Sequence, residues 1–319
     1  MIEPIRPIVL GDIEEARVRI AGTILRTPLV KLELGAPAPE IYLKLENLQP
    51  TNAYKIRGAT NAVAALSEAK RAHGVWTISA GNAGQGVAFA ARKFGIPCSI
   101  VAIETAPQTK LDRMRALGAR IVPVSYTDAW RAAESHAFEG MDGTFIHPFD
   151  NHQFIAGHGT MGLEIVEDLP EVRTVIAAIG GGGLITGLGS AIKALRPDVA
   201  ILGSEPETAA PYAFSLQEGG PSKFPDWQAS FVDGAGGQSV TARMWERMRP
   251  VVDGAITVTL DQTRDAMRLI ADKTRTIAEG AGALSLAAAL SGETLEGPIV
   301  CIVSGGNIDL QKFAELVTA

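Results

Sequence analysis

The sequence predicts an α/β fold of open, twisted, mostly parallel sheets with helices on both faces. Along 319 residues, short runs rich in Val and Ile alternate with longer amphipathic segments. The short runs are apolar throughout, as are parallel strands that helices cover on both faces. Glycine-rich loops follow three of these runs, and ligands of open α/β sheets bind at the carboxyl ends of strands. The length suits two domains in close association or one large α/β unit.

The predicted strands, in chain order, are VWTIS (75–79), CSIVAI (98–103), RIVPV (120–124), TVIAAI (174–179), VAILGSE (199–205) and PIVCIV (298–303). The predicted helices between and after them are 84–94, 107–118, 127–139, 184–195, 261–273 and 281–290. Pro107 opens the second of these helices and Gly118 closes it. Residues 219–239 are rich in Gly and Pro and predict a long loop, on the surface or over a site.

Composition and charge indicate an ordinary globular protein rather than a nucleic-acid-binding, membrane or secreted protein. Hydrophobic residues make up 46% and charged residues 20%, with a net charge of −6 spread along the chain. No basic block indicates nucleic acid, and no apolar run approaches the roughly 20 residues that span a bilayer. The N-terminal segment carries two prolines and early acids, unlike a signal peptide. Cys98 and Cys301 lie in strand-like runs, which predicts buried thiols rather than a disulfide or a zinc site. We therefore expect a cytoplasmic protein.

The glycine run in AAIGGGGLITGLGSAIKAL (177–195) is the strongest single signal. A strand runs into Gly180, Gly181, Gly182 and Gly183, and a helix follows. Glycines let backbone N–H groups approach a ligand closely, and the helix N-terminus adds unpaired donors and a positive dipole end. The run is neither a Walker loop nor a GxGxxG fingerprint. It predicts a phosphate cradle, with a merely tight turn as the alternative.

Two further loops follow predicted strands and open helices. TISAGNAGQG (77–86) places Ser79, Gly81 and Asn82 at a helix start, which suits a carboxylate, although a plain capping turn has the same composition. CIVSGGNIDLQKF (301–313) places Ser304 directly after a strand, where its hydroxyl can pair with a heterocyclic nitrogen. Asp309 is expected in the first turn of the following helix.

Lys55, in TNAYKIRGA (51–59), is the candidate nucleophile. Taken alone, such a lysine is ordinarily a solvated surface cation. A phosphate cradle and a nucleophilic lysine in one chain nevertheless predict pyridoxal phosphate, because this cofactor has a phosphate to hold and an aldehyde that an amine captures.

The landmarks KLENLQPTNAYKIRGA, SAGNAGQG, GGGGL, EGAGA and SGGNID occur in order between residues 44 and 309. Together they resemble the fold-type II pyridoxal phosphate enzymes, which share the fold of the tryptophan synthase β chain. The closest likeness is to the branch of serine/threonine dehydratases (threonine deaminases) and serine racemases. Each landmark is weak, but five in the right order are specific.

The resemblance implies a role for each matching residue. Lys55 would be the Schiff-base lysine and would then remove the Cα proton of the substrate. The cofactor would be held by Tyr54, Asn82, Gly180, Gly181, Gly182, Gly183, Leu184, Gly234 and Ser304. Ser79, Gly81 and Asn82 would orient the substrate carboxylate, and Arg131 would lie near the distal end of the substrate. The reaction would release a 2-oxo acid and ammonia from a β-hydroxy amino acid, and the enzyme would be a homodimer.

The resemblance also implies a large domain (1–50 and 147–319), a small domain (51–146) and an active site in the cleft between them. No C-terminal effector domain is expected after the last landmark. Relatives with a divalent-cation site would use Glu205 and a carboxylate at position 211. This chain has Pro211, so we expect no metal and a structural role for Glu205.

The chain departs from the family pattern where Asn52-Ala53-Tyr54 replaces Gly-Ser-Phe, Ala83 replaces His, His158 replaces Gln, and EGAGA lacks a proline after Glu279. Ala53 and Ala83 remove polar groups from the substrate side, so a β-substituent larger than that of serine is expected to fit. Arg131 could pair with a second carboxylate, as in 3-hydroxyaspartate, or be an ordinary solvated helix residue.

Three other functions compete with the lyase. A racemase needs an acid on the ring face opposite Lys55, and this chain has Ala80 where serine racemases place a serine. A β-replacement synthase of the cysteine synthase type fits the second and last landmarks less well. A non-catalytic phosphate-binding module would lack the visible absorbance of bound pyridoxal phosphate.

Overall fold

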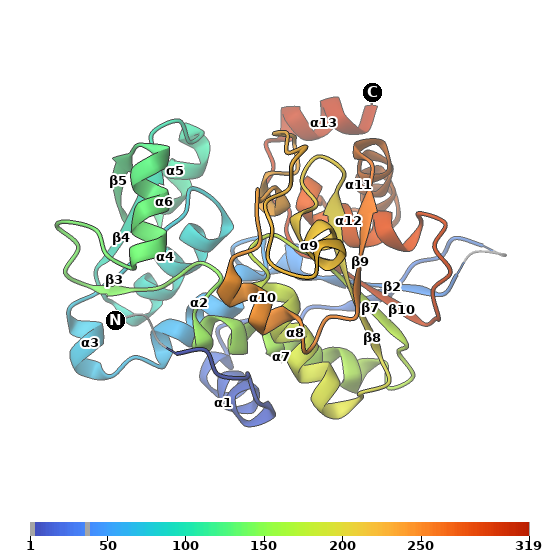
Figure 1. Cartoon of the computed structure of the whole chain (residues 1–319). Helices are drawn as coiled ribbons and strands as arrows, with labels where there is room; N and C mark the ends of the chain where they lie inside the picture. Colours follow the sequence, from blue (N-terminus) through green and yellow to red (C-terminus); the bar gives the residue numbers. More distant parts are fainter. Residues whose placement is uncertain (1–3, 36–38, 319) are drawn as a thin grey trace. The chain divides into compact units, whose positions relative to one another are not determined.

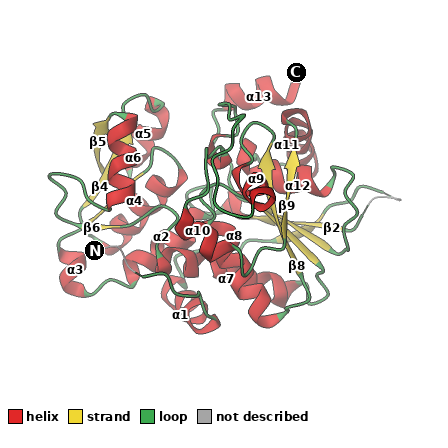
Figure 2. Ribbon diagram, in the orientation of Figure 1, coloured by secondary structure: helices red, strands yellow, loops and turns green. Residues whose placement is uncertain are grey.

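The computed structural model describes residues 4–35 and 39–318, which form two compact units. One unit comprises Met1–Ile24 and Lys55–His158, and the other comprises Leu25–Tyr54 and Gly159–Ala319. Each contains one sheet, and every strand pair is parallel among the described residues except β1 with β2. The predicted α/β class with mostly parallel sheets is confirmed (Figures 1 and 2).

The first unit is built on a four-stranded sheet in the order β5-β4-β3-β6. Its strands are β3 (Val75–Ile78), β4 (Cys98–Ile103), β5 (Arg120–Val124) and β6 (Thr144–Phe145), and its helices are α1 (Leu10–Ile20), α2 (Lys55–Ala64), α3 (Glu68–Ala72), α4 (Asn82–Phe94), α5 (Gln108–Ala116), α6 (Tyr126–Ser135) and the start of α7 (His152–Asp168). Alanines of α2 and α4 pack with Ile100 and Met114 in its core.

The second unit is built on a six-stranded sheet in the order β1-β2-β10-β7-β8-β9. Its strands are β1 (Leu29–Lys31), β2 (Ile41–Leu45), β7 (Thr174–Ala178), β8 (Ala200–Pro206), β9 (Gly254–Val258) and β10 (Ile299–Val303). Its helices are the end of α7, α8 (Gly183–Leu195), α9 (Pro211–Glu218), α10 (Ala242–Met248), α11 (Leu260–Thr274), α12 (Gly280–Ala289) and α13 (Leu310–Thr318), with short 3-10 turns η1 (Glu46–Leu48) and η2 (Asp233–Ala235). In Figure 1, α8 and α10 lie on one side of this sheet and α11 and α12 on the other.

The predicted elements are all present, with shifted ends. The helix predicted at 127–139 ends at Ser135, because His136 adopts a left-handed conformation (φ 55°) that stops the helix. The segment 219–239 is a long loop between α9 and α10, as predicted. Its own contacts order it, since Phe224 N donates to Gln238 O (2.9 Å) and Trp227 Nε1 donates to Gly236 O (3.0 Å).

The compact units differ from the predicted domain boundaries. Residues before 25 were expected in the same domain as residues 147–319, but α1 packs on α2 and lies in the unit that contains Lys55–His158. Two polar contacts fix it there: His152 Nε2 lies 3.0 Å from Asp12 Oδ2, and Arg19 Nη1 donates to Gln153 Oε1 (3.2 Å). The assignment of a small and a large functional domain, with the active site in a cleft between them, stays a prediction.

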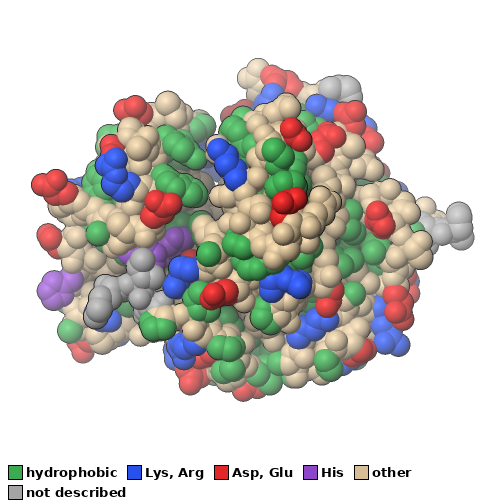
Figure 3. All heavy atoms as spheres, in the orientation of Figure 1, with side chains coloured by type: hydrophobic (Ala, Val, Ile, Leu, Met, Phe, Trp, Pro, Cys, Tyr) green, Lys and Arg blue, Asp and Glu red, His purple; other side chains and the backbone are tan. Residues whose placement is uncertain are grey.

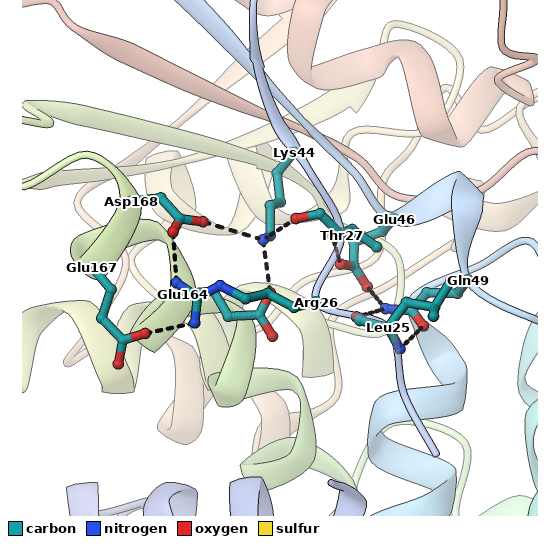
Figure 4. Close-up of polar contacts among 9 residues, drawn as sticks. All are labelled: Leu25, Arg26, Thr27, Lys44, Glu46, Gln49, Glu164, Glu167 and Asp168. Carbon is teal, nitrogen blue, oxygen red and sulfur yellow. Dashed lines mark hydrogen bonds and ion pairs between the residues drawn. The ribbon is translucent and has the colours of Figure 1, made fainter. Parts of the chain in front are cut away.

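A buried charge network ties α7 to the strand that precedes Lys55 (Figure 4). Lys44, on β2, is fully buried, and its Nζ lies 2.7 Å from Glu164 Oε2 and 2.7 Å from Thr27 O. Asp168 lies 3.9 Å from the same amine and also accepts from Arg26. Because a buried cation is stable only with close partners, this network fixes β2 against α7.

Two surface properties bear on the predictions from composition. On the face shown in Figure 3, acidic and basic side chains are interspersed. Among the described residues, many charged side chains form short-range pairs, such as Arg131 with Asp128. No helix within residues 4–35 and 39–318 is long and apolar enough to cross a membrane.

Candidate functional site

Lys55 is the first residue of α2 in the first unit. Its Nζ donates to Pro148 O (2.7 Å) and lies 5.4 Å from the centre of the Phe154 ring. The side chain is half-buried, and desolvation of the amine lowers the pKa of Lys55 to about 7. At this pKa about half of the amine is neutral at pH 7 and can act as a nucleophile or base, whereas a solvated lysine is almost entirely protonated there.

Three glycines let the helices around Lys55 pack closely. A Cβ on Gly86 of α4 would lie 3.2 Å from the Lys55 carbonyl carbon, and a Cβ on Gly157 of α7 would lie 2.6 Å from Arg57 O. On α2 itself, a Cβ on Gly58 would collide with Phe154 and His158. His158 is fully buried with its ring edge-on to Phe154, and its pKa is lowered by burial and by the charges of Lys55 and Arg57. The histidine next to the lysine is therefore neutral.

The second loop lies between β3 and α4, as the sequence predicts. Ser79 Oγ accepts a hydrogen bond from Gly81 N (3.1 Å), and Asn82 is the first residue of the 13-residue helix α4. A helix start of this kind presents N–H donors to an anion. Ala83 is buried in the core of the unit, so its methyl group packs on neighbouring apolar side chains.

Arg131 is not brought to this loop by any described contact. It lies on α6 with a side chain 72% exposed, and its Nη1 pairs with Asp128 Oδ1 at 3.0 Å. This arrangement is that of an ordinary solvated helix residue, which is one of the two alternatives that the sequence left open for Arg131.

The glycine run lies in the second unit, between β7 and α8. Gly182 has φ +85°, and α8 begins at Gly183. A Cβ on Gly180 would lie 2.7 Å from Gly234 O, so the run and the loop that carries Gly234 approach each other through backbone. Leu184 is buried and anchors the first turn of α8. The glycine loop and the start of α8 together form a cradle of the kind that a phosphate group needs.

Ser304 follows β10 and is buried, with Oγ donating to Ala281 O at 3.4 Å. Tyr54 N donates to Ser304 O (3.0 Å), which places the residue before Lys55 beside the serine. Burial and the nearby charge of Glu279 raise the pKa of Tyr54, so its phenol is neutral. Gly234 also lies close to these residues, because a Cβ at this position would lie 2.9 Å from Ala281 Cβ. The second unit therefore gathers Tyr54, the glycine run, Gly234 and Ser304.

Two polar residues in this group were not singled out from the sequence. Glu279 is buried at the N-cap of α12, and its Oε1 would lie 3.9 Å from a Cβ on Gly234. Asn307 is buried and donates from Nδ2 to Thr51 O (2.8 Å). Glu279 lies in the landmark EGAGA and Asn307 in the landmark SGGNID. Each is a polar residue within a glycine-rich segment, and that feature of the sequence could have indicated them.

Glu205, considered above as a metal ligand, instead caps the start of a helix. Its carboxylate accepts from Tyr212 N (2.9 Å) and Ala213 N (2.7 Å) at the start of α9. Burial raises the pKa of Glu205 to about 7, against the lowering effect of these two bonds. Across residues 4–35 and 39–318, no group of three or more His, Cys, Asp or Glu side chains is placed to hold a metal ion.

The chain matches the family model described as "Pyridoxal-phosphate dependent enzyme" over residues 20–305. It belongs to this family. The predicted cofactor, pyridoxal phosphate, and the predicted fold-type II architecture are confirmed. The geometry agrees, since the second unit offers a glycine cradle at a helix start, and the first offers a lysine whose pKa permits capture of an aldehyde.

Among named relatives, the chain is 39% identical to the L-threonine ammonia-lyase of Thermotoga maritima, a match that covers 97% of this chain and 78% of that protein. It is 38% identical to the L-threonine dehydratase catabolic TdcB of Staphylococcus aureus, over 97% of this chain and 91% of that protein. The resemblance to the dehydratase branch is confirmed, and with it the expectation that the chain is a lyase.

Solved structures of a threonine deaminase and of a serine racemase both resemble this chain in fold. The threonine deaminase of T.th. is 36% identical with a TM-score of 0.87, covering 95% of this chain and 99% of that chain. The serine racemase of Dictyostelium discoideum is 34% identical with a TM-score of 0.86 over the same shares. Fold similarity therefore does not separate lyase from racemase, and the choice depends on particular residues.

The pKa of Lys55 leads to a pH prediction for the cofactor-free protein. Only the neutral amine attacks an aldehyde, so the rate of covalent pyridoxal phosphate capture is expected to rise as pH increases through about 7. Stopped-flow absorbance between about pH 5.5 and 10 measures this rate. A midpoint near 10, that of an ordinary lysine, would contradict the effect of burial.

Proposed function

We propose that this chain is a pyridoxal phosphate-dependent ammonia-lyase that dehydrates and deaminates a β-hydroxy amino acid of the serine or threonine type. The products are a 2-oxo acid and ammonia. The observation that carries the proposal is the half-buried Lys55, whose pKa is lowered to about 7 and which directly follows the Tyr54–Ser304 contact. The threonine ammonia-lyase and threonine dehydratase names of the relatives support the substrate class.

Each group in this chain has a task in that reaction. Bound pyridoxal phosphate supplies an aldehyde that captures amines and a ring that withdraws electrons. The loop Gly180–Gly183 and the start of α8 would hold the phosphate, and Ser304 would pair with the ring nitrogen. Lys55 holds the cofactor and, as a neutral amine, removes the Cα proton of the substrate. The Ser79–Asn82 turn binds the substrate carboxylate through its N–H groups.

A serine at the ring nitrogen favours elimination. An aspartate there would keep that nitrogen protonated, whereas the neutral hydroxyl of Ser304 can accept or donate without adding charge. The buried hydroxyl donates to one main-chain carbonyl, Ala281 O. A weaker electron sink suits departure of the β-hydroxyl more than a long-lived carbanion.

The substrate screen is the direct test. Purified protein with pyridoxal phosphate is assayed for release of 2-oxo acid from L-serine, L-threonine, L-threo-3-hydroxyaspartate and phenylserine. Release from at least one of them at a rate that depends on Lys55 is expected. A higher kcat/KM for a bulkier substrate than for serine would support extra space for the β-substituent at Ala83. A higher kcat/KM for 3-hydroxyaspartate than for threonine would support an ion pair between Arg131 and the second carboxylate of the substrate. The Arg131→Ala variant tests that ion pair further.

Racemisation is the second candidate, because solved serine and aspartate racemases share this fold at TM-scores of 0.86 and 0.87. A racemase needs a proton donor opposite Lys55. Ala80 is partly buried against the apolar core of its unit and has no hydroxyl. Chiral chromatography of unreacted substrate is expected to show the L form alone, and rapid appearance of the D form would reverse the choice.

We further propose a cytoplasmic homodimer. Cys98 and Cys301 are both free and buried, which suits a reducing compartment. Sedimentation equilibrium measures the oligomeric state, and a monomer at micromolar concentration would contradict the dimer.

Gly180→Ala is expected to weaken pyridoxal phosphate binding by about 100-fold. The new methyl would lie 2.7 Å from Gly234 O, and backbone cannot give way as a flexible side chain would. Equilibrium titration by absorbance gives the dissociation constant. Gly220→Ala is the matched control, because a Cβ at Gly220 meets nothing within 4 Å. Equal affinity in the two variants would remove Gly180 from the phosphate site.

A further inference from the structure

Two loops of the second unit are hydrogen bonded to each other where β2 and β10 end. These strands are parallel neighbours, with Leu45 opposite Val303 at their carboxyl ends. The loop 51–54 precedes Lys55, and the loop 304–307 carries Ser304. Three bonds join them: Tyr54 N to Ser304 O (3.0 Å), Gly306 N to Asn52 O (2.9 Å) and Asn307 Nδ2 to Thr51 O (2.8 Å). We call this pair of loops the 51–54/304–307 clamp.

The loop 304–307 is also held from its other side. Gly305 O accepts from Glu279 N at 3.0 Å. A Cβ on Gly306 would collide with Ile277 O, and a Cβ on Gly282 would collide with Gly305 O. The loop therefore lies between two main-chain segments, with little room to shift.

The loop 51–54 is fixed at its start as well. Asn52 adopts a left-handed conformation (φ 54°), and its N donates to Gln49 O at 2.6 Å. Gln49 is in turn held by Leu25 and Glu46, as Figure 4 shows: Nε2 donates to Leu25 O (2.9 Å) and to Glu46 Oε2 (3.2 Å). A strained turn held by bonds on both sides is an arrangement that positions a neighbouring residue.

Asn307 supplies the one side-chain bond of the three in the clamp. Its side chain is 4% exposed, and its amide reaches Thr51 O, four residues before Lys55. A buried carbonyl that loses such a donor is left poorly satisfied, so the loop would relax to find another partner. The bond therefore acts together with the two main-chain bonds to fix where the backbone before Lys55 lies relative to Ser304.

We propose that Asn307 is a positioning residue that sets the offset between Ser304 and the backbone that leads into Lys55. This inference rests on the proposed function, in which Ser304 and Lys55 serve opposite ends of one rigid ring: the ring nitrogen and the aldehyde carbon. Because the ring has a fixed length, both ends are satisfied together only when the offset is right. Small displacements of a reacting group are known to have large effects on rate.

The test compares Asn307→Ala and Asn307→Asp with wild type in the full-length chain. Alanine removes the donor, and aspartate keeps the shape but turns an oxygen toward Thr51 O. Both variants are expected to raise the dissociation constant for pyridoxal phosphate by about tenfold and to lower kcat by at least as much. If the alanine variant does not fold, the aspartate variant still provides the test.

Thr174→Val is the matched control. Thr174 is buried at the start of β7, and its Oγ1 donates to a main-chain carbonyl, Glu296 O, at 2.7 Å. It lies in the same unit at the opposite end of the sheet, so its loss lowers the melting temperature without altering the clamp. A dissociation constant within twofold of wild type is expected for this control. Cofactor affinity unchanged in the Asn307 variants, or weakened equally in Thr174→Val, would overturn the proposal.

The two proposals fail in different ways. If wild type binds pyridoxal phosphate covalently but releases no 2-oxo acid from any hydroxy amino acid, the proposed reaction is wrong. The dissociation constants of the Asn307 variants still decide the role of Asn307, because cofactor binding is measured without substrate.

Discussion

Lys55→Ala is expected to lower kcat/KM for the best hydroxy amino acid by about 10⁴-fold or more, and to remove the visible absorbance of covalently held cofactor. The reason is that, in the proposed reaction, one amine serves both as the covalent anchor of the cofactor and as the base at Cα. Its pKa of about 7 makes it competent for both tasks near neutral pH. Steady-state kinetics and the absorbance spectrum of the purified variant give the two readings.

Borohydride reduction locates the reacting lysine independently of activity. Peptide mapping of the reduced wild-type protein is expected to find the cofactor on the peptide that contains Lys55. Lys70→Ala, on the exposed surface of α3, is the control and is expected to retain label and rate. Label on any other lysine would defeat the assignment.

Lys44→Met is expected to lower the free energy of unfolding by about 3–5 kcal/mol, the largest stability effect that we predict. The fully buried ammonium holds Glu164 at 2.7 Å and Asp168 at 3.9 Å (Figure 4). Without it, a largely buried carboxylate loses its nearest cation, and Thr27 O loses a donor. Urea denaturation of the cofactor-free protein, followed by circular dichroism and fluorescence together, measures the change.

Two variants separate the buried pair from a general effect of losing a lysine. Lys31 lies at the end of the neighbouring strand β1, and Lys31→Met removes its exposed ion pair with Glu40, so a much smaller change is expected. The double variant Lys44→Met/Glu164→Leu is expected to recover much of the loss, because an apolar pair needs no compensation for buried charge. A single Lys44→Met variant as stable as Lys31→Met would show that the network does not stabilise the unit.

The sequence predicted the strands that are buried on both faces, because such strands are short apolar runs whatever their partners. β7 and β10 are examples, with every residue buried. It failed to single out β2, whose run IYLKL contains the buried Lys44. A charged residue in a local window indicates a surface, and only the acidic side chains of α7, about 120 residues later, explain how it is buried.

The site shows the same division. Local sequence indicated the glycine loop, the Ser79–Asn82 turn, Ser304 and Lys55, since each depends on residue types that suit a strand end or a helix start. It left open whether Arg131 is exposed, and it could not indicate that Asn307 bonds to Thr51 across 256 positions of sequence. Both depend on which side chains the fold brings near.

By itself, then, the sequence determined the α/β class, the cofactor and the positions of the glycine loop and Lys55, which we propose as the phosphate cradle and the nucleophile, because backbone conformation and residue chemistry act locally. The tertiary structure alone decided that β10 lies between β2 and β7, which sets Ser304 beside the segment that leads to Lys55. It alone lowered the pKa of Lys55, because desolvation depends on the atoms that surround the amine. Those atoms come from residues as distant as Pro148 and Phe154, which no local pattern places next to residue 55.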